Sequence, residues 1–161
     1  MKYFQDDFYQ TPNPALNKIP AFEKAFLDQI YEDVPPPKAS APPMGPKGPD
    51  FSRYRAAWLF DSVKHGTYMK AMVPDGQYDK VDPSAIFSAS FPPTYIIHGG
   101  ADTGVDPKFS QRAHAELKEK GVETELVVVE GAAHGFDHGA KPGDEKFEIV
   151  VKGFKFLRDH V

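Results

Sequence analysis

The last 70 residues follow an alternating pattern of strand, helix, strand and helix. Two short apolar, β-branched runs, 94–97 and 124–129, have the composition of buried strands. The stretch 107–120, which Asp106 precedes and Gly121 ends, and the stretch 147–159 both repeat apolar residues at helical spacing. Strands that alternate with helices predict a parallel sheet with right-handed crossovers. We therefore expect an α/β fold, with ligands at the carboxyl ends of its strands.

Each predicted strand is followed by a Gly-rich loop with one ionisable side chain. Asp102 comes shortly after the first strand, and His134 comes at a similar interval after the second. Adjacent strands lie about 4.8 Å apart, so the two loops open on one edge and these side chains can meet. A carboxylate beside an imidazole fixes its tautomer and stabilises the imidazolium that forms when the ring takes a proton. The pair is therefore predicted to be the acid and the base of a catalytic triad.

The sequence does not show a nucleophile for this pair. The 161 residues contain neither a Gly-x-Ser-x-Gly turn nor a cysteine. None of the serines considered lies between glycines on a strand-to-helix turn, so we expect them to cap helices or lie on the surface; these are Ser62, Ser88, Ser90 and Ser110.

The second loop carries two histidines that could bind a metal ion. His134 and His138 are four residues apart, and Asp102 or Asp137 could add a third ligand. The spacing falls in a Gly-rich loop rather than on a helix, and the sequence lacks a closed carboxylate-rich ligand set. We expect no metal and no cofactor.

The first half of the chain is Pro-rich and less regular. Fourteen of the 16 prolines lie before residue 94, and the segment 35–49 is predicted to be a loop. Its Pro43-x-x-Pro46 spacing could form a polyproline ligand, but a surface connection is favoured for so short a stretch.

Three elements are expected around this loop. Residues 1–14 are read as the end of a truncated strand that runs into a loop. Helices are expected at 20–32 and at 51–64, the second with Asp50 as its N-cap. The aromatic face of the second helix, which includes Trp58, is interpreted as packing rather than as a ligand site.

Composition sets broad limits. A 40% hydrophobic content over 161 residues fits a globular domain. The net charge of −4, with both signs interspersed, favours neither nucleic acid nor an anionic membrane as a partner. The first 20 residues lack an apolar signal segment and no run is apolar enough to span a membrane, so a cytoplasmic location is the default expectation.

The two loops together carry a family resemblance. The stretches Ile97–Asp102 and Gly131–Phe136 resemble the acid and base segments of the α/β-hydrolase fold, in particular the carboxylesterase and hormone-sensitive-lipase-like group called fold-3. The resemblance covers residues 91–161 well, as the C-terminal βαβα unit of the core with flanking helices. It covers residues 1–90 more weakly, as a cap-like helical insertion. It implies that Asp102 is the triad acid and His134 the base.

The run His98-Gly99-Gly100 has two interpretations. Members of this group carry a similar run in the oxyanion loop, upstream of the nucleophile. Here an Asp loop follows instead, so His98 is interpreted as a structural residue at the strand end, with the oxyanion role as the alternative.

The resemblance implies a serine hydrolase acting on a small-molecule carboxylic ester. It also implies that the nucleophile elbow and the oxyanion loop lie upstream of Met1, so the chain alone is expected to be inactive. A prolyl-oligopeptidase-like serine peptidase and a non-catalytic truncated protein are the alternatives. A strand left without its inner neighbour would present an open edge, which predicts self-association.

Overall fold

The computed structural model describes residues 3–32, 44–45 and 48–160. The chain forms two compact units, Tyr3–Tyr78 and Asp79–Val161, and each is described by itself. The predicted division at residues 90 and 91 stays a prediction. The Pro43-x-x-Pro46 spacing, for which a surface connection was favoured, and most of the predicted loop 35–49 lie outside the described residues.

The second unit is built on two parallel strands. β3 (Thr94–Gly99) pairs in register with β4 (Thr124–Val129), from Thr94 opposite Thr124 to Gly99 opposite Val129. Helix α5 (Lys108–Glu119) connects them, and α6 (Glu145–Asp159) follows β4. The predicted α/β architecture, a short parallel sheet with flanking helices, is confirmed. Both strands end at the edge from which the two Gly-rich loops start.

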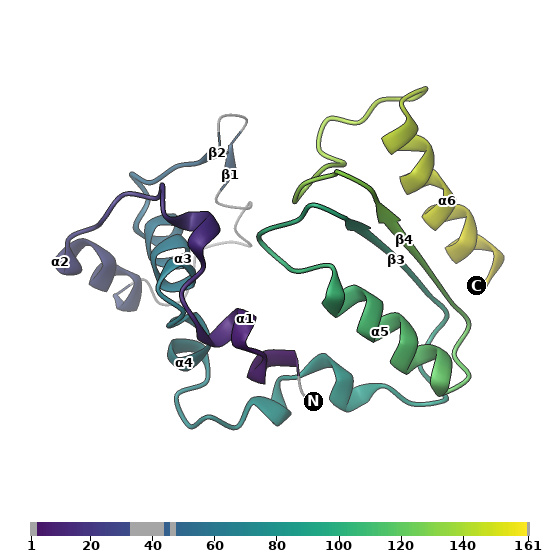
Figure 1. The fold of residues 1–161 in the computed structure, drawn as a ribbon, viewed down its shortest axis with the longest axis horizontal. Helices are drawn as coiled ribbons and strands as arrows, with labels where there is room; N and C mark the ends of the chain where they lie inside the picture. The colour runs from purple at the N-terminus through teal and green to yellow at the C-terminus, as the bar shows by residue number, and fades with distance from the viewer. Residues whose placement is uncertain (1–2, 33–43, 46–47, 161) are drawn as a thin grey trace. The chain divides into compact units, whose positions relative to one another are not determined.

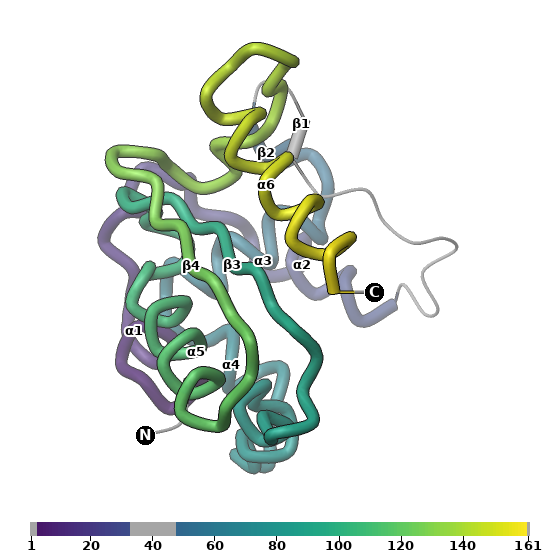
Figure 2. The backbone as a smooth tube through the Cα atoms, turned by 90° about the vertical axis from the view of Figure 1, so that its right-hand side faces the viewer, coloured from purple at the N-terminus to yellow at the C-terminus, as the bar shows by residue number. Residues whose placement is uncertain are grey.

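Helices cover both faces of this strand pair, α5 on one and α6 on the other (Figures 1 and 2). Alternation along β3 turns Tyr95 and Ile97 toward α6, where the backbone of Gly153 leaves them room. A Cβ at Gly153 would lie 3.0 Å from the Tyr95 ring, so a side chain there would require the ring to move by a few tenths of an ångström. On the other face, Leu117 of α5 is 1% exposed and anchors the core.

Asp106 and Gly121 mark the two ends of helix α5. The Asp106 carboxylate accepts a hydrogen bond from Lys108 N at 2.9 Å in the turn before α5, whose N-cap is Pro107. Gly121 ends this helix with φ at +79°, a conformation that side-chain-bearing residues rarely adopt. Two 3-10 turns, η4 (Tyr78–Lys80) and η5 (Pro83–Ile86), precede β3.

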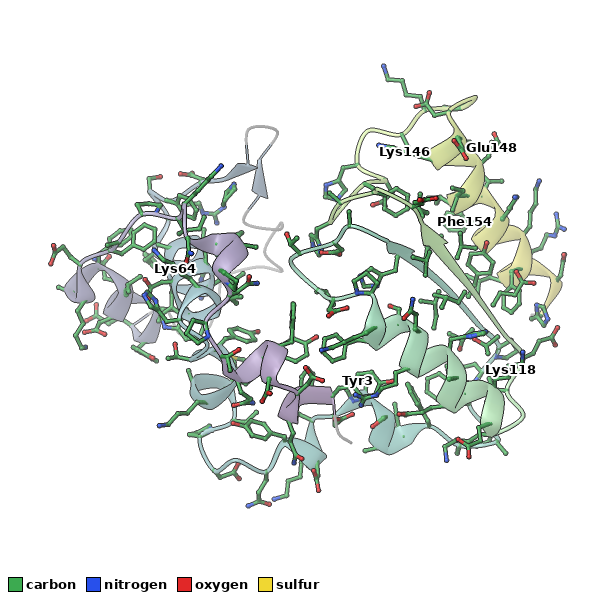
Figure 3. The ribbon with its side chains drawn as sticks, in the orientation of Figure 1. Tyr3, Lys64, Lys118, Lys146, Glu148 and Phe154 are labelled. Carbon is green, nitrogen blue, oxygen red and sulfur yellow. The ribbon has the colours of Figure 1, made fainter. Side chains whose placement is uncertain are left out.

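The first unit consists of short helices and one small β-ladder. Its elements are η1 (Tyr3–Gln5), α1 (Asp7–Gln10), η2 (Pro14–Leu16), α2 (Lys24–Leu27), η3 (Asp28–Tyr31), β1 (Met44–Gly45), β2 (Gly48–Pro49), α3 (Tyr54–Lys64) and α4 (Tyr68–Met72). Strands β1 and β2 are antiparallel. Lys64, labelled in Figure 3, lies at the end of α3. It donates to the Ile19 carbonyl at 2.7 Å and ties the helix to the segment between η2 and α2.

Aromatic side chains fill much of this unit. Phe51 packs against Phe22 and Phe60, with ring centroids 5.4 and 5.6 Å apart. Trp58 packs against Tyr68 at 6.0 Å. The aromatic residues of the predicted helix 51–64 therefore lie in packing contacts.

Three local predictions for this unit are wrong. The truncated strand predicted in residues 1–14 is replaced by η1 and α1, because the Asp6 carboxylate accepts from Phe8 N and starts a helical turn. The helix predicted at 20–32 begins only at Lys24, since Glu23 is extended, and continues as the 3-10 helix η3. Asp50 binds Ser52 in a turn rather than capping α3, which begins at Tyr54.

In the described residues β3 pairs only with β4, so its other edge has no strand beside it there. The self-association predicted for that edge stays a prediction. Within the same residues, no helix combines the length and the apolar character needed to cross a bilayer.

Candidate active site

The loops after β3 and β4 are joined by backbone hydrogen bonds. Gly100 N donates to Val129 O at 2.7 Å, and Ala101 N donates to Ala132 O at 2.9 Å. Gly99 makes this approach feasible, because a Cβ there would lie 2.5 Å from Ala132 O. The sequence thus brings the acid loop and the base loop to one edge of the sheet through glycines at their start.

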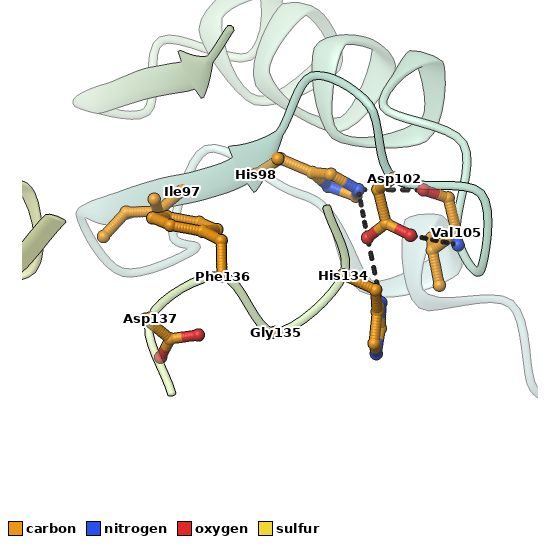
Figure 4. A pocket seen from close by; sticks show the side chains of 9 residues that line it. Ile97, His98, Asp102, Val105, His134, Gly135, Phe136 and Asp137 are labelled. Carbon is orange, nitrogen blue, oxygen red and sulfur yellow. Dashed lines mark hydrogen bonds and ion pairs between the residues drawn. The ribbon is translucent and has the colours of Figure 1, made fainter. Parts of the chain in front are cut away.

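Asp102 and His134 meet at this edge. His134 Nδ1 lies 2.9 Å from Asp102 Oδ2, the contact that the sequence predicted (Figure 4). The Asp102 side chain is 6% exposed, whereas the His134 side chain is 56% exposed. The Asp102 carboxylate is therefore held inside the protein, and the His134 imidazole extends toward solvent.

The other carboxylate oxygen of Asp102 is held by the backbone of its own turn. Gly104 N and Val105 N donate to Oδ1 at 2.8 and 2.9 Å. Burial pushes the pKa of Asp102 upward, but the hydrogen bonds from Val105 N, His134 and Gly104 N outweigh it, so the pKa lies below its ordinary value. Asp102 is therefore ionised at neutral pH.

The ionised acid determines the tautomer of neutral His134. A carboxylate only accepts hydrogen bonds, so Nδ1 of His134 carries the hydrogen that points at Asp102. The lone pair of a neutral ring is then on Nε2, on the side away from the acid. This is the nitrogen that a general base uses to take a proton from a hydroxyl.

A cavity of about 320 Å³ adjoins the pair. Its lining includes His98, Asp102 and His134 together with Ile97, Phe136 and Asp137. Ile97 and Phe136 supply apolar lining, and Figure 4 shows their side chains next to each other. The space beside the base can therefore receive the apolar part of a small molecule.

His98 lies at the end of β3 with both ring nitrogens bonded inside the protein. Nε2 lies 2.9 Å from Val105 O, and Nδ1 lies 2.6 Å from Ser110 Oγ. This arrangement fits the structural interpretation of His98. The sequence did not predict that Val105 and Ser110 would be the partners of His98. The turn that carries Val105 could have been predicted, because the spacing of Asp102 and Gly104 is typical of an Asx turn.

The remaining residues considered in the sequence lie elsewhere. Ser62 donates to the Leu59 carbonyl, and Ser88 contacts Ser90 on the surface. His138 is exposed. Across the described ranges, His, Asp and Glu side chains form no cluster of three that could hold a metal ion, and the expectation of no metal stays a prediction.

A parallel β3–β4 pair between two helices, with an acid and a base after successive strands, is a part of the α/β-hydrolase fold. Residues 53–161 match the model of the prolyl oligopeptidase family, and the chain belongs to this family. The predicted α/β-hydrolase fold is confirmed, and the family shown is the one held as the alternative to the carboxylesterase group.

Curated relatives include two fungal enzymes. The non-reducing polyketide synthase adrD of Penicillium rubens is 47% identical over 73 residues, which cover 43% of this chain and 3% of the synthase. The non-reducing polyketide synthase ausA of Emericella nidulans is 36% identical over 107 residues, which cover 62% of this chain and 4% of the synthase. The chain thus spans only a few per cent of the length of these relatives.

Solved structures similar to the chain include an esterase of Thermogutta terrifontis. Its propionate-bound form aligns with a TM-score of 0.45 and 29% identity, over 61% of this chain and 33% of the esterase. The form phosphorylated by paraoxon aligns with a TM-score of 0.44 and 32% identity, over 49% of this chain and 31% of the esterase.

Proposed function

We propose that Asp102 and His134 are the acid and base of a serine hydrolase that cleaves carboxylic esters. The observation that carries this proposal is the 2.9 Å hydrogen bond between a buried carboxylate and an exposed imidazole. The serine would come from a segment outside residues 1–161, because these residues contain no Gly-x-Ser-x-Gly turn.

The chemistry follows from the protons on His134. Nε2 takes the proton of the serine hydroxyl as the serine oxygen attacks the ester carbonyl. The carboxylate of Asp102 stabilises the imidazolium that results. Nε2 then gives the proton to the leaving alkoxide, and an acyl-enzyme remains. Water then attacks the carbonyl of the acyl-enzyme and gives a proton to Nε2. Nε2 returns this proton to the serine oxygen as the bond between serine and the acyl group breaks, and the carboxylic acid is released.

Two observations support an ester as the substrate. The segments Ile97–Asp102 and Gly131–Phe136 resemble those of the carboxylesterase group. The cavity beside His134 has apolar walls from Ile97 and Phe136, which suit an acyl or alkyl group.

The test uses a longer protein, called the extended protein, which is expressed from the same reading frame with the sequence upstream of Met1 included. We expect it to hydrolyse p-nitrophenyl esters. His134→Ala should lower kcat/KM by on the order of 10⁴-fold or more. His138→Ala is the matched control, because His138 is an exposed histidine of the same loop. Hydrolysis that survives His134→Ala, or an extended frame without a serine elbow, would refute the proposal.

The family match favours a second candidate, a serine peptidase of the prolyl oligopeptidase type. His134 Nε2 would then protonate a leaving amine rather than an alkoxide, with Asp102 in the same role as before. Comparing a p-nitrophenyl ester with a prolyl p-nitroanilide peptide on the same extended protein separates the two. A higher kcat/KM for the peptide would favour the peptidase.

A further inference from the structure

His98 bridges the Asp102 carboxylate and the backbone carbonyl of Val105. Its Nε2 lies 2.9 Å from Val105 O and 3.3 Å from Asp102 Oδ2, the oxygen that binds His134. The side chains of His98 and Asp102 are 11% and 6% exposed, so water has little access to replace these contacts. Figure 4 shows the interactions converging on the acid.

The partners of His98 fix the tautomer of its neutral ring. A backbone carbonyl only accepts hydrogen bonds, so Nε2 carries a hydrogen that points at Val105 O. In the neutral ring Nδ1 is then an acceptor, and the Ser110 hydroxyl donates to it at 2.6 Å. Ser110 belongs to α5, so the ring is anchored to a helix on one side and to the acid turn on the other.

Val105 couples this anchor to the acid. Its carbonyl accepts from His98, and its N–H donates to Asp102 Oδ1. The Val105 N–H is also the largest of the contacts that lower the pKa of Asp102 against the effect of burial. A shift of Val105 would therefore change the orientation of the Asp102 carboxylate and raise its pKa toward the ordinary value.

We propose that His98 and Ser110 are positioning residues, which hold the turn 102–105 so that Asp102 Oδ2 faces His134. The inference rests on the proposed function, since positioning this acid matters to a reaction only if His134 is a base. Ser110 fixes the His98 ring, His98 fixes Val105, and Val105 fixes the carboxylate.

The test measures the acid turn directly in the 161-residue chain. Hydrogen exchange of the Gly104 and Val105 amides reports their bonds to Asp102, and the carboxyl ¹³C shift of Asp102 reports its titration. In Ser110→Ala and His98→Leu we expect both amides to exchange about tenfold faster, the effect of losing one hydrogen bond. The titration midpoint of Asp102 should rise toward its ordinary value.

Two further variants separate positioning from general loosening. His98→Gln keeps an N–H near the position of Nε2, so it should restore exchange to within about threefold of the wild type. Ser88→Ala is the matched control for Ser110→Ala, because the Ser88 hydroxyl bonds the Ser90 hydroxyl on the surface at 3.0 Å. It should change neither amide. Unchanged exchange and an unchanged Asp102 midpoint in both Ser110→Ala and His98→Leu would overturn the inference.

The readout does not depend on catalysis. The extended protein could fail to hydrolyse esters while the Gly104 and Val105 amides still exchange faster in these variants. The proposed function would then be refuted, and the inference that His98 and Ser110 position Asp102 would remain supported. If the extended protein is active and the variants leave the turn unchanged, the positioning inference alone is overturned.

Discussion

Replacing Gly99 by alanine should separate the acid loop from the base loop. Gly99 is not among the glycines with positive φ, so alanine fits the backbone conformation and the effect comes from the added methyl alone. That methyl would lie 2.5 Å from Ala132 O and 2.8 Å from Ala133 O. Both are backbone atoms, so rotating a side chain cannot relieve the overlap.

The size of the effect follows from these distances. Cβ atoms essentially never come within 3.0 Å of another heavy atom, so Ala132 O must withdraw by at least about 0.5 Å. This movement weakens the Ala101 N to Ala132 O hydrogen bond. Overpacking costs about 1–3 kcal/mol and a lost hydrogen bond about 1 kcal/mol, so we expect Gly99→Ala to destabilise the chain by about 2–4 kcal/mol.

Urea denaturation measures the free energy of unfolding, and exchange of the Ala101 amide reports the contact between the loops. Gly104→Ala is the matched control, because its methyl would meet only ordinary contacts at 3.4 Å and beyond. It should change the stability by no more than about 1 kcal/mol. A Gly99→Ala chain as stable as the control, with the Ala101 amide still protected, would refute the reasoning.

Three other predictions concern pH and reactivity. Hydrogen bonds to the Phe156 carbonyl and to Glu123 raise the pKa of His160, so the stabilisation by this charge is full below the ordinary value of 6.5 and is lost as pH rises through the raised pKa. Glu123→Gln should weaken that pH dependence in urea titrations. Asp102 has a lowered pKa, so its stabilisation is lost as pH falls below the ordinary value of 3.8, and Asp102→Asn should remove this acid dependence in the same assay. A fluorophosphonate probe should leave the purified 161-residue chain unlabelled, and a labelled band would show that a nucleophile lies within it.

The second unit was predictable because its sequence patterns agree with one another. Residues 124–129 are apolar and β-branched between turn residues, and β4 has these bounds. The strand predicted at 94–97 continues to Gly99, since backbone pairing with β4 does not need an apolar side chain. The first unit was harder to predict, because local bonds such as the one from Phe8 N to the buried Asp6 carboxylate start its short helices, and residue propensities do not specify such bonds.

The site was predictable only in part. Asp102 and His134 follow their strands at similar intervals, and parallel pairing alone brings such loops together. The bonds from His98 to Val105 and Ser110 depend on how α5 lies against β3, which spacing along the chain does not specify. The catalytic roles of Asp102 and His134 stay predictions.

The tautomer of His134 tests the central claim most directly. Long-range ¹H–¹⁵N correlation spectra of the 161-residue chain, recorded at a pH where the ring is neutral, show which ring nitrogen carries the hydrogen. The account predicts the Nδ1–H form, because the Asp102 carboxylate lies 2.9 Å from Nδ1. A ring with its hydrogen on Nε2 would contradict it, because Nε2 would then have no lone pair with which to accept a proton from a serine.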